Sequence, residues 1–170
     1  MISHAIHSAL AVTIKWLGQA CFVITTAHGT SFLFDPPNPS VGYPVAAHSI
    51  QCKAIFVSHN HPDHDWVEAA IGNPQIIQPM TTPALPDSGF INIPGEKPGY
   101  ITYTRIFAYH DNVQGAQRGP DTITIFSIGN GDLRIAHMGD IGELQLTQDQ
   151  INAMGRVDVL MIPVGGFFHG

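Results

Sequence analysis

The chain has 170 residues, of which 44% are hydrophobic and 12% are charged, and its formal net charge at pH 7 is −6. This length suits one domain with a sizeable core, and the low charge content excludes a disordered or coiled-coil chain, because both classes carry many charges and few large apolar residues. The acidic balance argues against a nucleic-acid-binding surface, whereas an excess of ten histidines over seven lysines and arginines indicates site chemistry.

Short strands separated by turns are predicted for the first part of the chain. β-Branched and aromatic residues, interrupted by Gly and Pro, indicate strands at residues 12–17, 20–26 and 31–34. A wholly apolar segment at residues 54–57 predicts a strand that is covered on both faces. A short helix is predicted at residues 66–71, where Gly72 ends it.

The second part of the chain continues this alternation. Residues 74–99 are rich in Pro and Gly and are predicted to be mostly irregular, with two brief strands. Further strands are predicted at residues 100–109, 122–128 and 133–137, the last two joined by a tight turn at residues 129–132. A helix is expected from its N-cap Thr147 to Met154, with Gln150 placed for a capping box. A buried strand at residues 157–162 completes an α/β or α+β layered fold.

The cysteines and the N-terminal segment indicate the cell interior. Cys21 and Cys52 are too few for a disulfide scaffold and too far apart for a CxxC site, so reduced thiols are expected. Residues 1–12 lack the basic start and the long apolar core of a signal peptide, and no apolar stretch of about 20 residues follows. We therefore expect a cytoplasmic protein with no membrane or nucleic-acid partner.

Four metal-binding side chains follow the buried strand at residues 54–57. They stand in the pattern HxHxDH and are His59, His61, Asp63 and His64. In an extended segment the first two histidines point the same way, and Pro62 then turns the chain so that the last two side chains can face a second point nearby. Two imidazoles with a third ligand suit one divalent ion, and a carboxylate with an imidazole suits another. The pattern therefore predicts a two-metal site.

Further ligand candidates stand at the ends of two later strands. His110 closes the strand at residues 100–109, and His137 and Asp140 close the strand at residues 133–137. A single strand-end histidine is more often a hydrogen-bonded loop residue than a ligand, but a dinuclear site requires such donors. Two ions lower the pKa of a bridging water, and Asp63 is placed to orient the resulting hydroxide or to shuttle the proton that the water loses.

With these motifs the sequence resembles the metallo-β-lactamase superfamily of metal-dependent hydrolases, and within it the bacterial branch that includes ascorbate-6-phosphate lactonase. The matching segments keep the family's order and are residues 14–22, 33–36, 58–65, 109–111, 136–140 and 157–166. The resemblance implies an α/β fold, a four-layer αββα sandwich. It also implies two metal ions, with zinc favoured by the many histidines and with manganese or iron as alternatives.

The resemblance also implies a ligand set for each ion. The first ion would be held by His59, His61 and His110, and the second by Asp63 and His64, with Asp140 bridging both. His137 would lie behind the ligands and orient them. Asp35 matches an aspartate beneath the site, although capping of the loop before two prolines explains it equally well.

The family pattern continues past the strand at residues 157–162 with a helix, a further strand and a last metal-binding histidine. We therefore expect residues 1–170 to form a single domain that is truncated at the C-terminus, with an incomplete second half. His169 is the candidate in the tail to replace the last ligand. An exposed edge strand would favour association, so a homo-oligomer is also expected.

The leading interpretation is a hydrolase in which a hydroxide bridging two divalent metals cleaves a small ester, lactone, amide or phosphoester. One alternative is a di-iron redox protein of the same fold, whose members typically carry Glu where this chain has His61. Another is a catalytically impaired metal-binding module that lacks the last ligand. The leading interpretation implies a small-molecule substrate.

Overall fold

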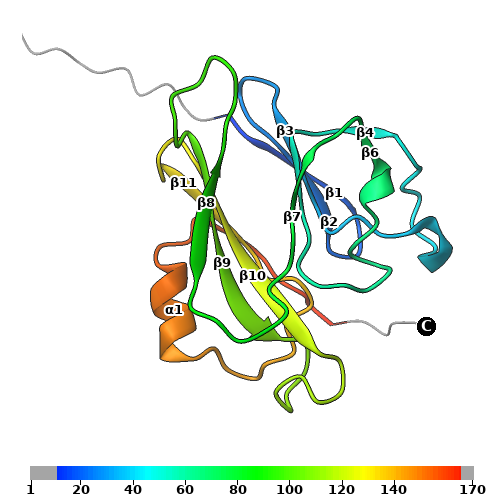
Figure 1. Ribbon diagram of the computed structural model, residues 1–170, viewed down its shortest axis with the longest axis vertical. Helices are drawn as coiled ribbons and strands as arrows, with labels where there is room; N and C mark the ends of the chain where they lie inside the picture. Colours follow the sequence, from blue (N-terminus) through cyan, green and yellow to red (C-terminus); the bar gives the residue numbers. More distant parts are fainter. Residues whose placement is uncertain (1–10, 166–170) are drawn as a thin grey trace, which may run out of the picture.

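The computed structural model describes residues 11–165, which form two five-stranded β-sheets packed face to face (Figure 1). The first sheet has the order β1 (Thr13–Gly18), β2 (Cys21–Thr25), β3 (Ser31–Phe34), β5 (Ala54–Phe56) and β7 (Gln75–Ile77). The second has the order β12 (Val159–Met161), β11 (Leu133–His137), β10 (Pro120–Ile128), β9 (Ile101–Tyr109) and β8 (Asp87–Ile91). A small parallel pair, β4 (Ile50–Gln51) and β6 (Ala70–Ile71), and one helix, α1 (Gln148–Met154), complete the elements that position the site.

Aromatic side chains fill the space between the two sheets. Phe32 and Phe34 on β3 are fully buried there, and the ring of Phe32 lies 4.8 Å from that of Phe126 on β10, measured between centroids. Leu33, between them, points to the opposite face of the first sheet, as the period of two along a strand requires. Covered on both faces, β3 is apolar along almost its whole length, as is β5.

Each sheet also has a covered outer face. On the outer face of the first sheet, Leu33 and Ile55 are covered by a segment that includes two buried alanines. Ala70 is the first residue of β6, and Ala69 directly precedes it. On the second sheet, the outward-facing isoleucines of β10 pack against Met154 of α1. The described residues therefore form a β-sandwich with a largely irregular cover on one side and a helix on the other. The four-layer αββα arrangement stays a prediction.

Most of the predicted elements are present. The strands β3 and β11 have the predicted bounds, and α1 begins after its N-cap Thr147 with both hydrogen bonds of a capping box to Gln150. The strand β10 begins two residues earlier than predicted, at Pro120. The short parallel pairing of β4 with β6 was not predicted, because its strands have only two residues each.

The helix predicted at residues 66–71 is wrong. Only the 3-10 helix Val67–Ala69 forms there, and the next two residues enter β6 and pair with Ile50 and Gln51. A segment of six residues gains little from helix propagation, so tertiary contacts decide its conformation. Here the burial of Ala69 and Ala70 against the first sheet favours the extended pairing.

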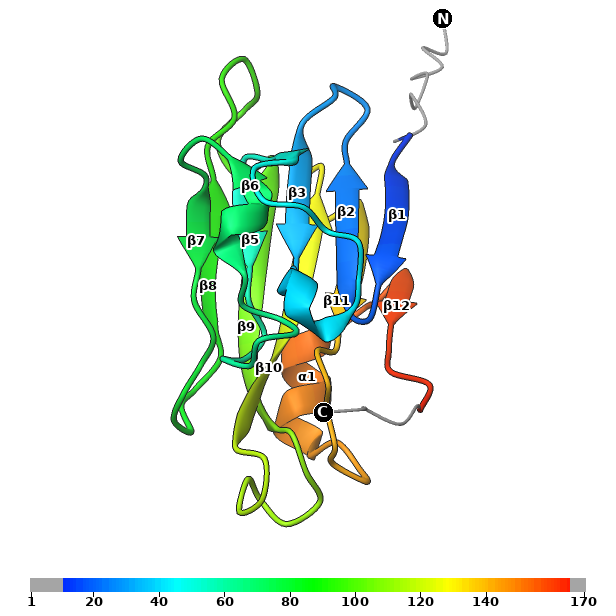
Figure 2. The same ribbon diagram turned by 90° about the vertical axis from the view of Figure 1, so that its right-hand side faces the viewer.

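Two edge strands, β1 and β12, lie on the same side of the molecule (Figure 2). They carry large apolar side chains that face solvent, including Trp16, which is 63% exposed, and Leu160, which is 51% exposed. Both cysteines are free, as predicted, and burial raises the pKa of the Cys21 thiol to about 12. No helix within residues 11–165 has the length and apolar character needed to cross a membrane.

Candidate metal centre

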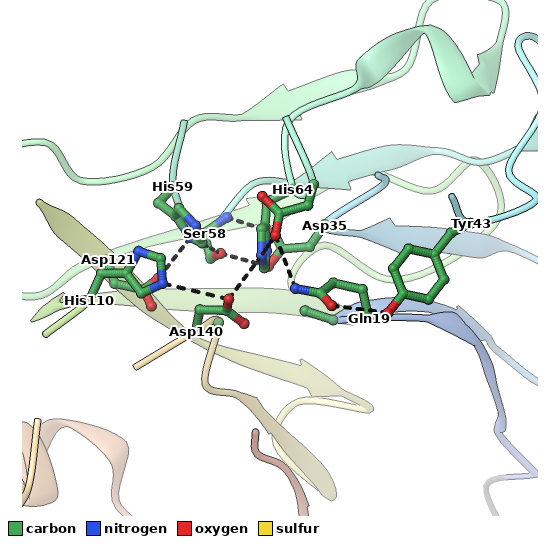
Figure 3. A network of polar contacts seen from close by, with 12 residues as sticks. Gln19, Asp35, Tyr43, Ser58, His59, His64, His110, Asp121 and Asp140 are labelled. Carbon is green, nitrogen blue, oxygen red and sulfur yellow. Dashed lines mark hydrogen bonds and ion pairs between the residues drawn. The ribbon is translucent and has the colours of Figure 1, made fainter. Parts of the chain in front are cut away.

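The candidate site lies where four strands end at one edge of the sandwich. The strands β3 and β5 are parallel, and β9 and β11 run in one direction because both are antiparallel to β10. The residues that follow these four strands include Asp35, His59, His110 and Asp140. Strand direction therefore brings together side chains that are far apart in the sequence (Figure 3).

A first group of possible metal ligands consists of His59, His61 and His110. One ring nitrogen from each lies within 4.8 Å of the others. The ring centroids are 4.6 Å apart for His59 and His61 and 4.4 Å apart for His59 and His110. His59 and His110 are buried, whereas His61 is partly exposed. Three imidazoles at this spacing suit one divalent ion.

A second group consists of His59, Asp63 and His64, whose ligand atoms also lie within 4.8 Å of one another. His59 thus belongs to both groups, and its ring centroid is 4.1 Å from that of His64. Asp140 lies between the two groups: its Oδ2 atom is 3.3 Å from His64 Nε2 and 3.5 Å from His110 Nε2. A carboxylate in this place can contact cations held by either group.

Several buried ring nitrogens in these groups have no hydrogen-bond partner among residues 11–165. They are Nε2 of His59, Nε2 of His64 and both nitrogens of His110. A buried polar atom without a partner is costly, since it has lost its hydrogen bonds to water. Imidazole nitrogens and carboxylates are the donors that zinc, manganese and iron accept. The residues present therefore fit a divalent metal.

Asp35 holds two of these histidines in one orientation. Its Oδ2 atom accepts hydrogen bonds from His64 Nδ1 at 2.8 Å and from Ser58 Oγ at 2.6 Å, and Ser58 Oγ lies 2.9 Å from His59 Nδ1. Because the carboxylate only accepts, Ser58 donates to Asp35 and itself accepts from His59. Both rings therefore carry hydrogen on Nδ1, which leaves their Nε2 lone pairs free for a metal.

The carboxylates of the site are anionic at neutral pH. Burial alone would raise the pKa of Asp35, but the nearby His137, His64 and His59 outweigh it and hold that pKa below its usual range. For Asp63 the nearby His64 outweighs burial, and for Asp140 the nearby His110 and His64 do, so the pKa values of both carboxylates are lowered. Burial would lower the pKa of His64, but its three carboxylate neighbours raise it, so a cation bound at its Nε2 atom would take the place of a proton there. Excess negative charge favours a cation here.

His137 lies behind these groups rather than within them. Its Nε2 atom donates to the carbonyl of Ala20 at 2.8 Å, and its Nδ1 atom accepts from the backbone of Gly139 at 3.3 Å. Both ring nitrogens are therefore used, and His137 packs edge-on against Phe22. This is the position that the resemblance implied.

Gly139 allows the end of β11 to approach the site closely. Its φ angle is +57°, and a Cβ atom there would lie 2.4 Å from Asp121 Oδ1 and 2.8 Å from Ser58 Cβ. Any larger residue would displace one of these neighbours. The turn that presents Asp140 thus depends on glycine at position 139.

Besides Ser58, three residues near the site were not predicted to belong to it. Gln19 donates to Asp63, Tyr43 donates to Gln19, and the buried Asp121 lies 3.5 Å from His59 Nδ1 through its Oδ1 atom. The sequence offers a sign that Asp121 belongs to the site, because it is a carboxylate at the start of a largely apolar strand. It offers one for Gln19 as well, which lies in a segment that matches the family. Tyr43 had none.

Two further residues come from the sequence analysis: Asp111, at the end of the matching segment 109–111, and His169, the candidate in the tail. Asp111 does not face the site, since its carboxylate accepts hydrogen bonds from four backbone N–H groups of the next loop. His169 lies outside the described residues.

The chain is similar in sequence to known proteins. A family model described as "Beta-lactamase superfamily domain" matches residues 13–169. The chain is 28% identical to a UPF0173 protein of Pyrococcus abyssi (strain GE5 / Orsay), over 90% of this chain and 70% of that protein. It is also 28% identical to a UPF0173 metal-dependent hydrolase of Anaeromyxobacter sp. (strain K), over 91% of this chain and 65% of that protein.

A third relative, a UPF0173 metal-dependent hydrolase of Staphylothermus marinus, is 28% identical over 91% of this chain and 72% of its own length. The chain thus spans roughly two thirds of the length of these relatives. The likeness to the ascorbate-6-phosphate lactonase branch stays a prediction. The match over residues 13–169, together with the HxHxDH motif at the edge of a β-sandwich, shows that the chain belongs to the β-lactamase superfamily of metallo-β-lactamase-fold proteins.

Proposed function

We propose that this chain is a metal-dependent hydrolase that binds two divalent ions and cleaves a small ester, lactone, amide or phosphoester. The observation that carries the proposal is the set of buried imidazole nitrogens of His59, His64 and His110, which have no hydrogen-bond partner in the described part of the chain. The printed names of the relatives from Anaeromyxobacter and Staphylothermus support a metal-dependent hydrolase. Zinc is the favoured ion, because most of the donors are imidazoles.

The proposed ligands follow the two groups of the site. His59, His61 and His110 would hold the first ion, Asp63 and His64 would hold the second, and Asp140 would contact both. The bridging role is supported by Asp140 Oδ2, which is within 3.5 Å of one histidine from each group. Membership of the superfamily also supports the αββα arrangement, of which the described residues show both sheets and α1.

Different residues of the chain have different roles in the proposed reaction. When bound, the two ions supply hydroxide near neutral pH and polarise the scissile bond. Asp63 is the proposed catalytic residue: its carboxylate is ionised at neutral pH, so it can orient the attacking water and accept its proton. Asp35 and Ser58 keep His59 and His64 in the orientation that leaves Nε2 free. A small-molecule substrate enters from the side of His61, because His61 is the partly exposed histidine of the site.

The proposal is tested by elemental analysis of the purified chain together with assays on lactones, esters, amides and phosphodiesters. We expect close to two ions per chain and hydrolysis of at least one class, with both reduced in His61→Ala. His28→Ala is the matched control, because His28 is 59% exposed and lies in the turn between β2 and β3, at the end of β3 opposite to Asp35. Two bound ions without turnover of any class would contradict the hydrolase, and an ion-free chain would contradict the site.

A further inference from the structure

The turn between β1 and β2 approaches the candidate metal centre with an unusual backbone. Gln19 has a φ of +51°, a left-handed conformation that residues other than glycine rarely adopt, and the pairing of β1 with β2 is irregular just before it. The turn is fixed at two points: Trp16 Nε1 donates to the Gln19 carbonyl at 2.8 Å, and His137 Nε2 donates to the Ala20 carbonyl at 2.8 Å. A strained backbone persists where its surroundings determine it in this way.

The side chain of Gln19 connects this turn to Asp63. Gln19 Nε2 donates to Asp63 Oδ2 at 3.0 Å. Gln19 Oε1 accepts from the Tyr43 hydroxyl at 3.3 Å, and Figure 3 shows these two side chains side by side. The orientation of the amide follows from chemistry, because an ionised carboxylate can only accept and must face the amide nitrogen. The amide oxygen then faces Tyr43, which donates to it.

Tyr43 is itself placed by a glycine. Its ring lies on Gly18, where an added Cβ atom would come within 2.3 Å of Tyr43 Cδ1. Gly18 has a φ of +113°, so both its conformation and its lack of a side chain favour glycine. A continuous set of contacts therefore runs from Gly18 through Tyr43 and Gln19 to Asp63.

The other ligands of the HxHxDH motif show what this set of contacts does. His64 is held by Asp35, and His59 is held by Ser58, each through the ring nitrogen that faces away from the site. Asp63 follows Pro62 in a loop, so no strand fixes its direction. Gln19 supplies to Asp63 the orienting contact that Asp35 supplies to His64.

We infer that Gln19, held by Tyr43, is a positioning residue for Asp63 and thereby sets the metal affinity of the group His59, Asp63 and His64. This assignment rests on the proposed two-metal function. The hydrogen bonds of the Gln19 side chain reach only Asp63 and Tyr43 among the described residues, so the group His59, His61 and His110 does not depend on it directly. The inference therefore concerns one of the two ions.

The test is a titration of the metal-free protein with Co²⁺, followed by the visible absorption of the bound ion in competition with a chelator. We expect two binding steps in the unaltered chain. Gln19→Leu keeps the size of the side chain but removes both polar atoms, and it should weaken one step by about 10- to 100-fold. Tyr43→Phe keeps the ring on Gly18 and should weaken the same step by a smaller factor.

Two further variants identify the step and control for general effects. His61→Ala alters the other group, so it should weaken the step that Gln19→Leu leaves unchanged. Gln148→Leu is the matched control: Gln148 is an exposed residue of α1 whose side chain, within residues 11–165, bonds only Asn152, and its loss should leave both steps unchanged. The thermal midpoint of each metal-free variant reports whether the fold itself has been weakened.

The outcomes separate the inference from the proposed function. Two normal steps in both Gln19→Leu and Tyr43→Phe would overturn the inference and leave the two-metal site intact. Equal weakening of both steps with a lowered thermal midpoint would also overturn it, because Gln19 would then be only structural. Fewer than two steps in the unaltered chain would overturn the two-metal proposal and the inference with it. Weakening of one step alone, at an unchanged midpoint, supports the inference.

Discussion

Asp35 Oδ2 lies 2.8 Å from His64 Nδ1, and the same oxygen accepts from Ser58, which contacts His59. One buried carboxylate beneath the site therefore orients a histidine in each of the two ligand groups. The backbone φ of Asp35 is +42°, which is rare for a residue other than glycine. Such a conformation indicates that the surrounding structure holds Asp35 firmly. The consequences of this arrangement can be measured.

Asp35→Asn should weaken the binding of both metal ions by about 10- to 100-fold each. The substitution keeps the shape of the side chain but replaces one accepting oxygen with a donor, so the donors on its two oxygens can no longer all be satisfied: the Ser58 backbone N–H on Oδ1, and the Ser58 hydroxyl and His64 on Oδ2. Metal titration of the variant measures the effect. Asp87→Asn, which alters an exposed ion pair with Arg105, is the control and should bind both ions normally. Loss of only one ion in Asp35→Asn would show that the carboxylate does not serve both groups.

Gly139→Ala should reduce metal binding and lower the thermal midpoint. The added Cβ atom would clash with Asp121 and Ser58. The positive φ would add about 1 kcal/mol or more of backbone strain. Gly131→Ala is a matched control, because its φ is +93° but nothing lies within 4 Å of the added atom. We expect the control to be destabilised by strain alone and to bind metal normally. Equal metal binding in the two variants would contradict the close approach at Gly139.

Asp111 should stabilise the loop after β9 in a pH-dependent manner. Burial opposes ionisation, but hydrogen bonds from four backbone N–H groups, including those of Val113 and Gly115, lower the pKa of Asp111 from 3.8 to about 2. A lowered pKa in the folded state means that the contribution is fully present above pH 3.8 and is lost as the pH falls towards 2. Urea unfolding of the unaltered chain and of Asp111→Asn should therefore show a difference in free energy that shrinks below pH 4. A difference that is constant with pH would contradict this account.

The exposed apolar edge should make the chain associate. Trp16 on β1 and Leu160 on β12 face solvent on edge strands, and such strands pair readily with other chains. Sedimentation velocity should detect dimers or larger species, which should decrease in Trp16→Lys and in Leu160→Lys. A monodisperse monomer at all protein concentrations would contradict the prediction.

Local patterns predicted the parts of the fold and site that depend on a few neighbouring residues. The HxHxDH motif identified His59, His61, Asp63 and His64, and the spacing of Thr147 and Gln150 predicted the start of α1. Apolar, β-branched and aromatic residues between turn residues predicted β3 and β11 with their observed bounds.

Features that depend on distant residues were not predicted. The pairing of β4 with β6 brings Ile50 beside Ala70, and no pattern within six residues can indicate such a pairing. Tyr43 reaches the site only because its ring lies on Gly18. Asp121 is placed by the register of β10 against its neighbours, a tertiary property. In each case the determining contact joins segments that are separated in the sequence.

The central claim, that two metal ions held by this site cause hydrolysis, is tested most directly by adding zinc to the metal-free chain while the hydrolysis of a responsive substrate is measured. The account predicts no turnover without metal and a rate that rises until two equivalents are bound. Turnover by the metal-free chain, or binding that saturates below two equivalents, would contradict it.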